Sequence, residues 1–176
     1  MTAKWSDYVA GAVLTAANLN DTVDNFQDVA IFSEDQASGT EGGGSTSGSF
    51  AKRTLNTTRV NNITGCSISS SVITLTQAGT YYFRGTCPAF KPNGCQVIIR
   101  NTTASSNAIV GQTNYFSSAD NVMAQASVEG VVTITASTNF ELQQRVGSSV
   151  AANGLGAAQS FGVGEVYSQL YIRRIA

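Results

Sequence analysis

Apolar and polar side chains alternate with a period of two along most of the chain, which is the pattern of half-buried β-strands. Between Ile73 and Thr76, an isoleucine and a leucine alternate with two threonines, and Gln77-Ala78-Gly79 then ends the strand as a turn. This pattern predicts about ten short strands: 53–60, 66–69, 72–76, 80–86, 96–101, 108–112, 122–128, 131–136, 140–146 and 166–175. So many short strands predict a mainly β protein, a β-sandwich or jelly roll.

The N-terminal part of the chain follows a helical period instead. The apolar stripe consists of Leu19, Val23, Phe26 and Ala30, spaced by four, three and four residues. Such a stripe predicts one helix, with Thr15 as its N-cap and Leu14 at a hydrophobic-staple position. A helix of about 15–18 residues is marginal alone. The stripe must therefore pack against two further copies, against the β-domain, or against a larger particle, and the sequence leaves these alternatives open.

A run rich in glycine and serine separates this helix from the strands. Residues 38–50 have the composition of a flexible linker, with a mobile surface loop as the alternative. The charge balance changes at the same place: residues 1–41 carry seven acids and one base, whereas residues 42–176 carry four acids and nine bases. We therefore divide the chain into an anchor segment (1–37), a linker (38–50) and a β-domain (51–176).

The chain lacks the residues that most enzymes use. It contains no histidine, which excludes Ser-His-Asp and Cys-His nucleophiles and histidine-based zinc sites. A glycosidase needs two carboxylates about 5–9.5 Å apart, and the predicted β-domain offers only Asp120, Glu129, Glu141 and Glu165. No phosphate-binding glycine loop is present. We therefore expect no catalysis and no cofactor or metal.

Composition also limits the partners. Charged residues make up 12% of the chain, against about 25% in an ordinary domain, and no basic cluster exceeds two residues, so we expect no nucleic acid. No segment has the ~20 apolar residues of a membrane span, and Trp5, Asp7 and Tyr8 interrupt any signal peptide. We expect no membrane insertion, and a protein acting outside the cell would leave by lysis.

The cysteine count is odd, which argues against a disulfide framework. The three cysteines are Cys66, Cys87 and Cys95. Cys87 and Cys95 flank a short loop, so a bridge between them remains an alternative to the buried free thiols expected in a reducing cytoplasm.

The last predicted strand has two different faces. Tyr167 and Tyr171 fall on one side, and Val166, Leu170 and Ile172 on the other. The glycine-rich run before it, 148–164, predicts an extended loop over a neighbouring subunit or at an exposed tip, with a mobile connector as the alternative.

One polar residue interrupts an otherwise apolar strand. Gln144 follows Phe140 and Leu142 on the same face of their strand. We expect this strand either to leave the core at Gln144 or to line a subunit interface there.

The order of segments from Arg53 onward resembles the C-terminal domains of bacteriophage appendage proteins. The segments are Arg53-Thr54-Leu55-Asn56-Thr57, Leu75-Thr76-Gln77-Ala78-Gly79-Thr80-Tyr81, Arg100-Asn101-Thr102-Thr103 and Val110-Gly111-Gln112-Thr113. The resemblance covers residues 53–176 and implies a homotrimeric jelly roll similar to the tumour necrosis factor fold, without catalytic residues. It implies that Tyr167, Tyr171 and Phe161 lie at the trimer interface.

The N-terminus resembles the leader of phage tail and fibre proteins. Trp5 is followed by Gly11 and then by Leu14-Thr15-Ala16-Ala17-Asn18-Leu19-Asn20. In those proteins the leader attaches to the virion. The resemblance and the helical stripe together give the expected particle-anchoring residues: Trp5, Leu14, Leu19, Val23 and Phe26.

The first functional hypothesis is a virion protein made in the host cytoplasm: a short trimeric tail fibre whose N-terminus binds other virion proteins. Its β-domain would be exposed to bind a glycan or protein of the host surface. The alternatives are a head decoration or cement protein, a polysaccharide-cleaving spike domain, and a cellular cytokine-like ligand, which the missing signal peptide disfavours.

Overall fold

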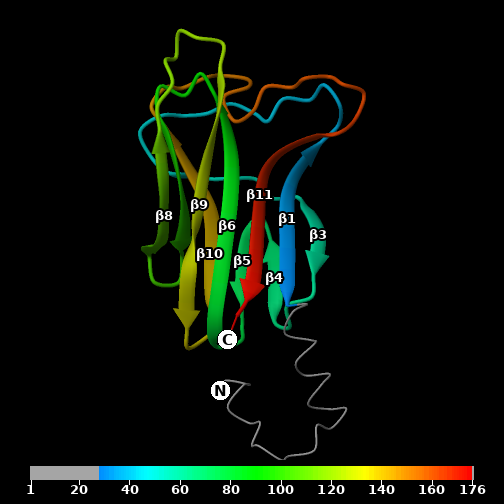
Figure 1. The fold of residues 1–176 in the computed structure, drawn as a ribbon, viewed down its shortest axis with the longest axis vertical. Helices are drawn as coiled ribbons and strands as arrows, with labels where there is room; N and C mark the ends of the chain where they lie inside the picture. Colours follow the sequence, from blue (N-terminus) through cyan, green and yellow to red (C-terminus); the bar gives the residue numbers. More distant parts are fainter. Residues whose placement is uncertain (1–27, 176) are drawn as a thin grey trace, which may run out of the picture.

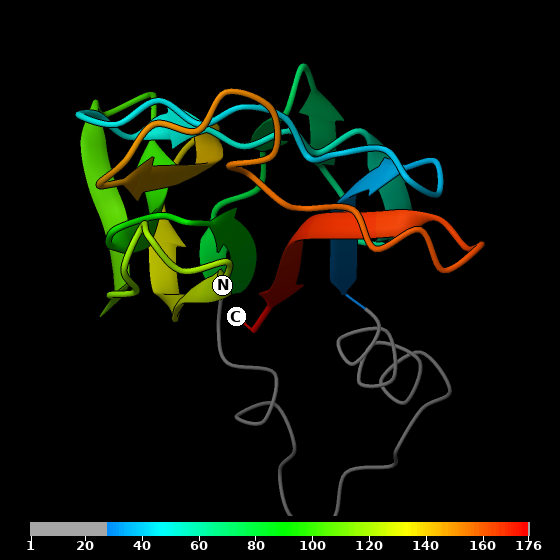
Figure 2. The ribbon, with the colours of Figure 1, turned by 90° about the horizontal axis from the view of Figure 1, so that it is seen from above.

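The structure, a computed structural model, describes residues 28–175. These residues form two antiparallel β-sheets packed face to face (Figures 1 and 2). The strands are β1 (Val29–Gln36), β2 (Ala51–Lys52), β3 (Thr57–Asn61), β4 (Cys66–Ser69), β5 (Val72–Leu75), β6 (Gly79–Phe90), β7 (Cys95–Asn101), β8 (Ser106–Asn114), β9 (Met123–Ile134), β10 (Thr138–Val146) and β11 (Glu165–Arg174). The predicted β-sandwich is confirmed.

Each sheet places distant strands side by side. The first sheet has the order β3-β1-β11-β6-β9, and the second has the order β4-β5-β10-β7-β8, with the short strand β2 paired to β10. The core between them includes Phe32, Tyr81, Phe83, Phe140, Leu142, Leu170 and Ile172, all fully buried. The rings of Phe83 and Phe140 meet at 5.1 Å and join the two sheets. Alternation fits this arrangement because one face of most strands is buried.

The sandwich begins earlier than the predicted boundary at residue 51. β1 lies inside the first sheet, where it pairs with β11 and β3. Ala30, the last residue of the predicted helical stripe, is fully buried in β1 opposite Ile172. The expectation failed here because the partner of β1 lies about 140 residues further along, beyond the reach of local periodicity. The rest of the predicted helix, with Trp5, Leu14, Leu19, Val23 and Phe26, lies outside the described residues.

The expected linker is a defined segment of the domain. Residues 37–50, called the strap below, cross the end of the sandwich beside residues 150–156 (Figure 2). Ser45 N donates to the Val150 carbonyl at 2.8 Å, and the Gly42 amide donates to the Gly156 carbonyl at 2.9 Å. A Cβ on Gly44 would overlap the Ala151 carbonyl. Glycine serves close backbone approach here, so the composition of a linker also suits a packed segment.

β9 is one continuous strand where the sequence predicted two. The expected turn at Glu129-Gly130 lies in the middle of β9, with Gly130 paired to Phe83. A Cβ on Gly130 would lie 2.8 Å from the Ile109 side chain of β8. This glycine therefore allows the two sheets to approach and does not mark a turn.

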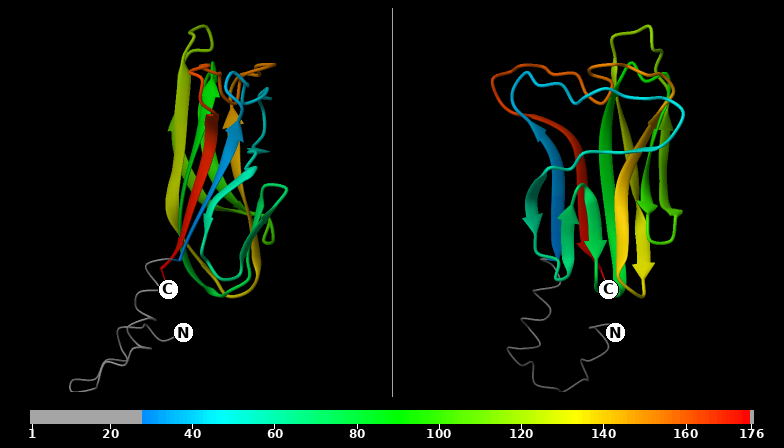
Figure 3. Two further views of the ribbon diagram at one scale, coloured as in Figure 1. Left: turned by 90° about the vertical axis from the view of Figure 1, so that its right-hand side faces the viewer. Right: turned by 180° about the vertical axis from the view of Figure 1, so that it is seen from behind.

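The two ends of the sandwich differ. The strap and residues 91–94, 115–122 and 147–164 gather at one end, called the loop end (Figures 1 and 3). The first and last described residues meet at the opposite end, where Arg174 N donates to the Asp28 carbonyl at 3.0 Å. Residues 1–27 therefore join the domain at the end opposite the loop end. Between residues 28 and 175, no helix has the length and apolarity to cross a membrane.

Candidate functional site

The outer surface of the five-stranded sheet is the first candidate site. Alternation along β11 sends Leu170 and Ile172 into the core and Gln169, Tyr171 and Arg173 outward. This open face consists of Ile31, Tyr82, Arg84, Thr86, Val131, Gln169 and Tyr171, and most of these residues line a hollow of about 460 Å³. The Tyr82 and Tyr171 rings meet edge to face at 6.1 Å in its centre.

The open face carries few charges. Arg84 stands opposite Glu129 in the pairing of β6 with β9. The Glu129 carboxylate also accepts a hydrogen bond from the Tyr82 hydroxyl, and this bond raises the pKa of Tyr82. Arg173 of β11, opposite Tyr82, is a further outward charge. Ile31, Thr86, Val131, Gln169 and Tyr171 are aliphatic, neutral polar or aromatic. Such a mixture suits contact with another protein surface better than it suits chemistry.

An exposed apolar patch continues the open face toward the loop end. It consists of Met123, Phe161, Val163 and Val166, of which Phe161 is 81% exposed and Val163 68% exposed. These residues, with Pro88 on β6, line a second hollow of about 390 Å³. The patch follows the upper ends of β6, β9 and β11, the strands of the open face. Large exposed apolar groups gathered on one surface mark an interaction site.

The three residues predicted at the trimer interface fall in different places. Tyr171 lies on the open face and Phe161 in the apolar patch, both accessible to a second chain. Tyr167 is buried within its own chain: its hydroxyl donates to the Thr40 carbonyl at 2.7 Å, and its ring covers Gly156. Burial raises the pKa of Tyr167 to about 12.

A register irregularity explains why Tyr167 is buried in its own chain whereas Tyr171 faces outward. The pairing of β1 with β11 shifts between Ser33 and Asp35. Near this shift both Tyr167 and Ser168 are buried, so strict alternation does not hold over the first residues of β11. A single alternation along the whole strand would place both tyrosines on one face, and no local sequence signal marks the bulge.

A buried ion pair, which was not predicted from the sequence, connects the two sheets near the loop end. The Arg53 guanidinium contacts the Glu34 carboxylate at 2.7 Å, and both side chains are at most 3% exposed. Arg53 Nε donates to Ser168 Oγ at 2.6 Å, and Nη2 donates to the Leu155 carbonyl at 2.9 Å. Arg53 thus joins β1, β11 and the loop 147–164.

Gln144 belongs to the same buried network. Its Oε1 accepts from Arg53 Nη1 at 3.1 Å, and its amide nitrogen donates to the Pro88 carbonyl at 3.1 Å. The strand therefore neither leaves the core at Gln144 nor turns the side chain outward. The polar interruption in β10 was the one sequence signal for this network.

Burial raises the pKa values of acidic groups in and beside the network. Burial raises the pKa of Glu34, and Arg53 opposes this rise. Burial also raises the pKa of the neighbouring Cys87 thiol to about 12. All three cysteines are free thiols in the structure. Within residues 28–175, no group of acidic or cysteine side chains is arranged to hold a metal.

Comparison with known proteins identifies the fold. No protein-family profile matches the chain, and no curated protein sequence matches it. Among solved structures, Eiger TNF from S. frugiperda has a TM-score of 0.57 at 11% identity, covering 84% of this chain and 92% of its own. The globular domain of zebrafish complement 1qA protein has a TM-score of 0.53 at 12% identity, covering 84% and 95%. The expected tumour-necrosis-factor-like jelly roll is therefore confirmed, whereas neither neighbour bears on a bacteriophage origin.

Proposed function

We propose that the protein is a homotrimeric bacteriophage virion protein, a short tail fibre or appendage. Its residues 1–27 attach to other virion proteins, and its loop end faces the host surface. The observation that carries this proposal is the open face with its adjoining apolar patch, which no other part of residues 28–175 covers, on a domain whose first and last described residues lie opposite its loops. The resemblance of the segments from Arg53 onward to phage appendage proteins supports the virion origin.

Self-association accounts for the open face. Tyr82, Tyr171 and Val131 carry aromatic and aliphatic surface that the rest of residues 28–175 does not cover, and Val131 is 54% exposed. Burial of such surface contributes about 25 cal/mol for each Å² removed from water. A closed ring of identical chains covers the face without leaving a free copy of it. Three chains arranged in parallel place three loop ends side by side.

The function is binding and not catalysis. Four of the described carboxylates are engaged in structural contacts: Glu34 with Arg53, Asp35 with Arg59, Glu141 with Lys52, and Glu165 with backbone amides. Three loop ends on one particle raise the effective concentration of each contact, so weak contacts to the host surface add up to firm attachment.

Light scattering tests the trimer. The full-length chain is expected to have three times its 18.3 kDa mass. Tyr171→Arg, which places a charge in the centre of the open face, is expected to lower that mass, because burying an unpaired charge is costly. Val110→Arg is the matched control, since Val110 is 59% exposed on the other sheet. A wild-type monomer would reject the proposal, and a trimeric Tyr171→Arg chain would reject the open face as the interface.

Position on the particle tests the virion role. Antibodies against the β-domain, imaged on purified phage, are expected to label the tail. Label on the head would identify the alternative, a capsid decoration or cement protein. Absence from purified particles would reject both roles, and depolymerisation of host capsule by the purified chain would identify a polysaccharide-cleaving spike instead.

A further inference from the structure

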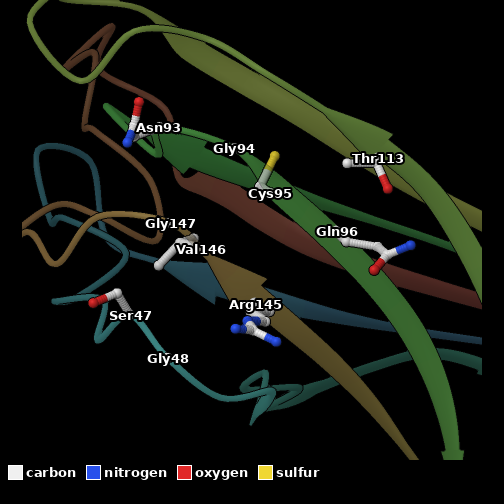
Figure 4. A pocket seen from close by; sticks show the side chains of 10 residues that line it. All are labelled: Ser47, Gly48, Asn93, Gly94, Cys95, Gln96, Thr113, Arg145, Val146 and Gly147. Carbon is white, nitrogen blue, oxygen red and sulfur yellow. The ribbon is translucent and has the colours of Figure 1, made fainter.

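A third hollow, which is polar, lies at the loop end on the outer surface of the six-stranded sheet (Figure 4). Its volume is about 440 Å³, within the range of small-molecule sites. The lining residues are Ser47, Gly48, Asn93, Gly94, Cys95, Gln96, Thr113, Arg145, Val146 and Gly147. This surface is on the opposite side of the sandwich from the open face, so a trimer formed through the open face leaves it accessible.

The floor of the polar hollow is fixed by backbone contacts. The Gly147 amide donates to the carbonyls of Pro92 and Gly94, at 2.9 and 2.8 Å, and the Ser148 amide donates to Pro92 at 2.8 Å. A Cβ on Gly147 would overlap the Asn93 carbonyl, and Gly94 has a φ of 98°. Two positions that require glycine keep side chains out of the floor. The hollow is therefore built into the backbone.

Three polar side chains cross the hollow in one row on adjacent strands. Arg145 of β10 stands opposite Gln96 of β7, which stands opposite Thr113 of β8 (Figure 4). The Gln96 amide nitrogen donates to the Gly111 carbonyl at 3.0 Å, which fixes the side chain and leaves its oxygen to accept a hydrogen bond. The Thr113 side chain is exposed beside it.

Arg145 supplies a positive charge that no described residue balances. Within residues 28–175, no hydrogen bond or ion pair engages its guanidinium. The nearest carboxylate on the same face of β10 is Glu141, four residues away, which corresponds to about 13 Å along a strand. Lys52 at 3.8 Å and the Gln143 amide at 2.7 Å already hold that carboxylate. The Arg145 guanidinium is thus available to a bidentate anionic group.

An aromatic ring lies beside Gly94, one of the lining residues. Tyr115 is 72% exposed, and its Cδ2 lies 4.0 Å from the position that a Cβ on Gly94 would occupy. A tyrosine ring offers an apolar face to the C–H groups of a sugar, while neutral amides and hydroxyls bind sugar hydroxyls. A bare phosphate would favour several cations or free backbone amides, but the amides of Gly147 and Ser148 are already paired.

We propose that the polar hollow binds a carboxylate-bearing sugar unit of a surface polysaccharide. Arg145 pairs with the sugar carboxylate, Gln96 and Thr113 bind ring hydroxyls, and Tyr115 covers one face of the ring. The inference rests on the proposed function, because it names the ligand class of the loop end. A parallel trimer presents three such hollows to one polymer, which suits repeated acidic units.

Nuclear magnetic resonance titration of the full-length chain tests the inference. The probes are trigalacturonic acid and 3′-sialyllactose, each against its neutral counterpart, galactotriose and lactose. At least one acidic sugar is expected to shift the amides of Gln96 and Gly147 and to bind at least tenfold more tightly than its neutral counterpart. Arg145→Gln is expected to weaken this binding at least tenfold, since a charge-assisted bidentate contact is lost. Arg145→Lys is expected to retain part of it.

The matched control is Arg100→Gln on β7. Arg100 lies on the same sheet but outside the hollow, and it bonds to Asn107 and to the Ser105 carbonyl. Its variant is expected to bind like the wild type. Absence of binding to both acidic sugars, equal binding of neutral ones, wild-type affinity in Arg145→Gln, or equal binding of inorganic phosphate would each overturn the inference. Light scattering of the same samples separates the proposed trimer from the proposed sugar site. A chain that is trimeric but does not bind acidic sugars rejects only the sugar site.

Discussion

Replacement of Arg53 by methionine removes the charge at the centre of the buried network while keeping most of its side-chain volume. The change breaks the 2.7 Å contact with Glu34 and the 2.6 Å hydrogen bond to Ser168. It leaves the Glu34 carboxylate, 3% exposed, without its cation. Removing one partner of a buried ion pair costs about 3–5 kcal/mol. We therefore expect Arg53→Met to lower the free energy of unfolding by about that amount at pH 7.

The same variant should show a characteristic pH dependence. Burial already raises the pKa of Glu34 above its ordinary 4.5, and Arg53 opposes that rise. Without Arg53 the folded-state pKa rises further. A carboxyl group with a raised folded pKa destabilises the fold as pH rises from its unfolded pKa through its folded pKa. The deficit should therefore shrink as pH falls toward 4.5, and a second change, Glu34→Gln, should recover about 1–3 kcal/mol at pH 7.

Urea unfolding followed by far-ultraviolet circular dichroism, at one fixed chain concentration, measures these differences. Arg59→Met is the matched control. Its ion pair with Asp35 is equally short, at 2.6 Å, but the side chains are 42% and 30% exposed. An exposed pair is worth less than about 1 kcal/mol. If Arg53→Met costs no more than Arg59→Met, or if its deficit is the same at pH 5 and pH 7, the reasoning is wrong.

Three further predictions concern other parts of the domain. Cys87, whose thiol has its pKa raised to about 12, should resist iodoacetamide at pH 8 in the native protein and react once urea unfolds it, as mass spectrometry would show. Hydrogen bonds from backbone amides lower the pKa of the Glu165 carboxyl group below 4.5. These hydrogen bonds should therefore be present above pH 4.5 and be lost as pH falls through the lowered pKa of the folded state. The chemical shift of the Ser160 amide, which lies 2.9 Å from the Glu165 carboxylate, measures the loss. Gly85→Ala should cost about 1–3 kcal/mol in the same urea assay, because a Cβ there would lie 2.7 Å from Leu142 Cδ1.

Period-two alternation located most of the sandwich because most strands bury one face. Ile73 and Leu75, which began the sequence analysis, are fully buried in β5 as their alternation requires. Alternation failed at β1, where Ser33 and Glu34 are both buried beside Phe32. A buried glutamate requires a cation to stabilise its charge, and the cation here, Arg53, lies 19 residues away in sequence. A local pattern cannot reveal a pairing between segments so far apart.

Glycine was the second source of error. The strap and the loop 147–164 have the composition of flexible segments, yet they hold each other through backbone hydrogen bonds. Gly42 would bring a Cβ within 2.9 Å of the Leu155 carbonyl if it were alanine. Glycine gives conformational freedom to an isolated chain, and in a folded chain it allows two backbones to approach closely. Composition alone does not separate these uses, and the contact between the strap and the loop 147–164 could be recognised only from the structure.

An ordered loop end bears on how the protein would bind. Arg53 fixes the loop at Leu155, and Ser45 fixes the strap to Val150, so these segments are held by contacts within one chain. A surface that is already ordered loses less conformational entropy when it binds a ligand. The open face differs, since no strand of residues 28–175 packs outside the rings of Tyr82 and Tyr171. The open face is thus suited to assembly through burial of apolar surface, and the polar hollow at the loop end is suited to recognition through fixed polar groups. A change at Tyr171 should therefore alter the number of chains in the oligomer, whereas a change at Arg145 should alter only ligand binding.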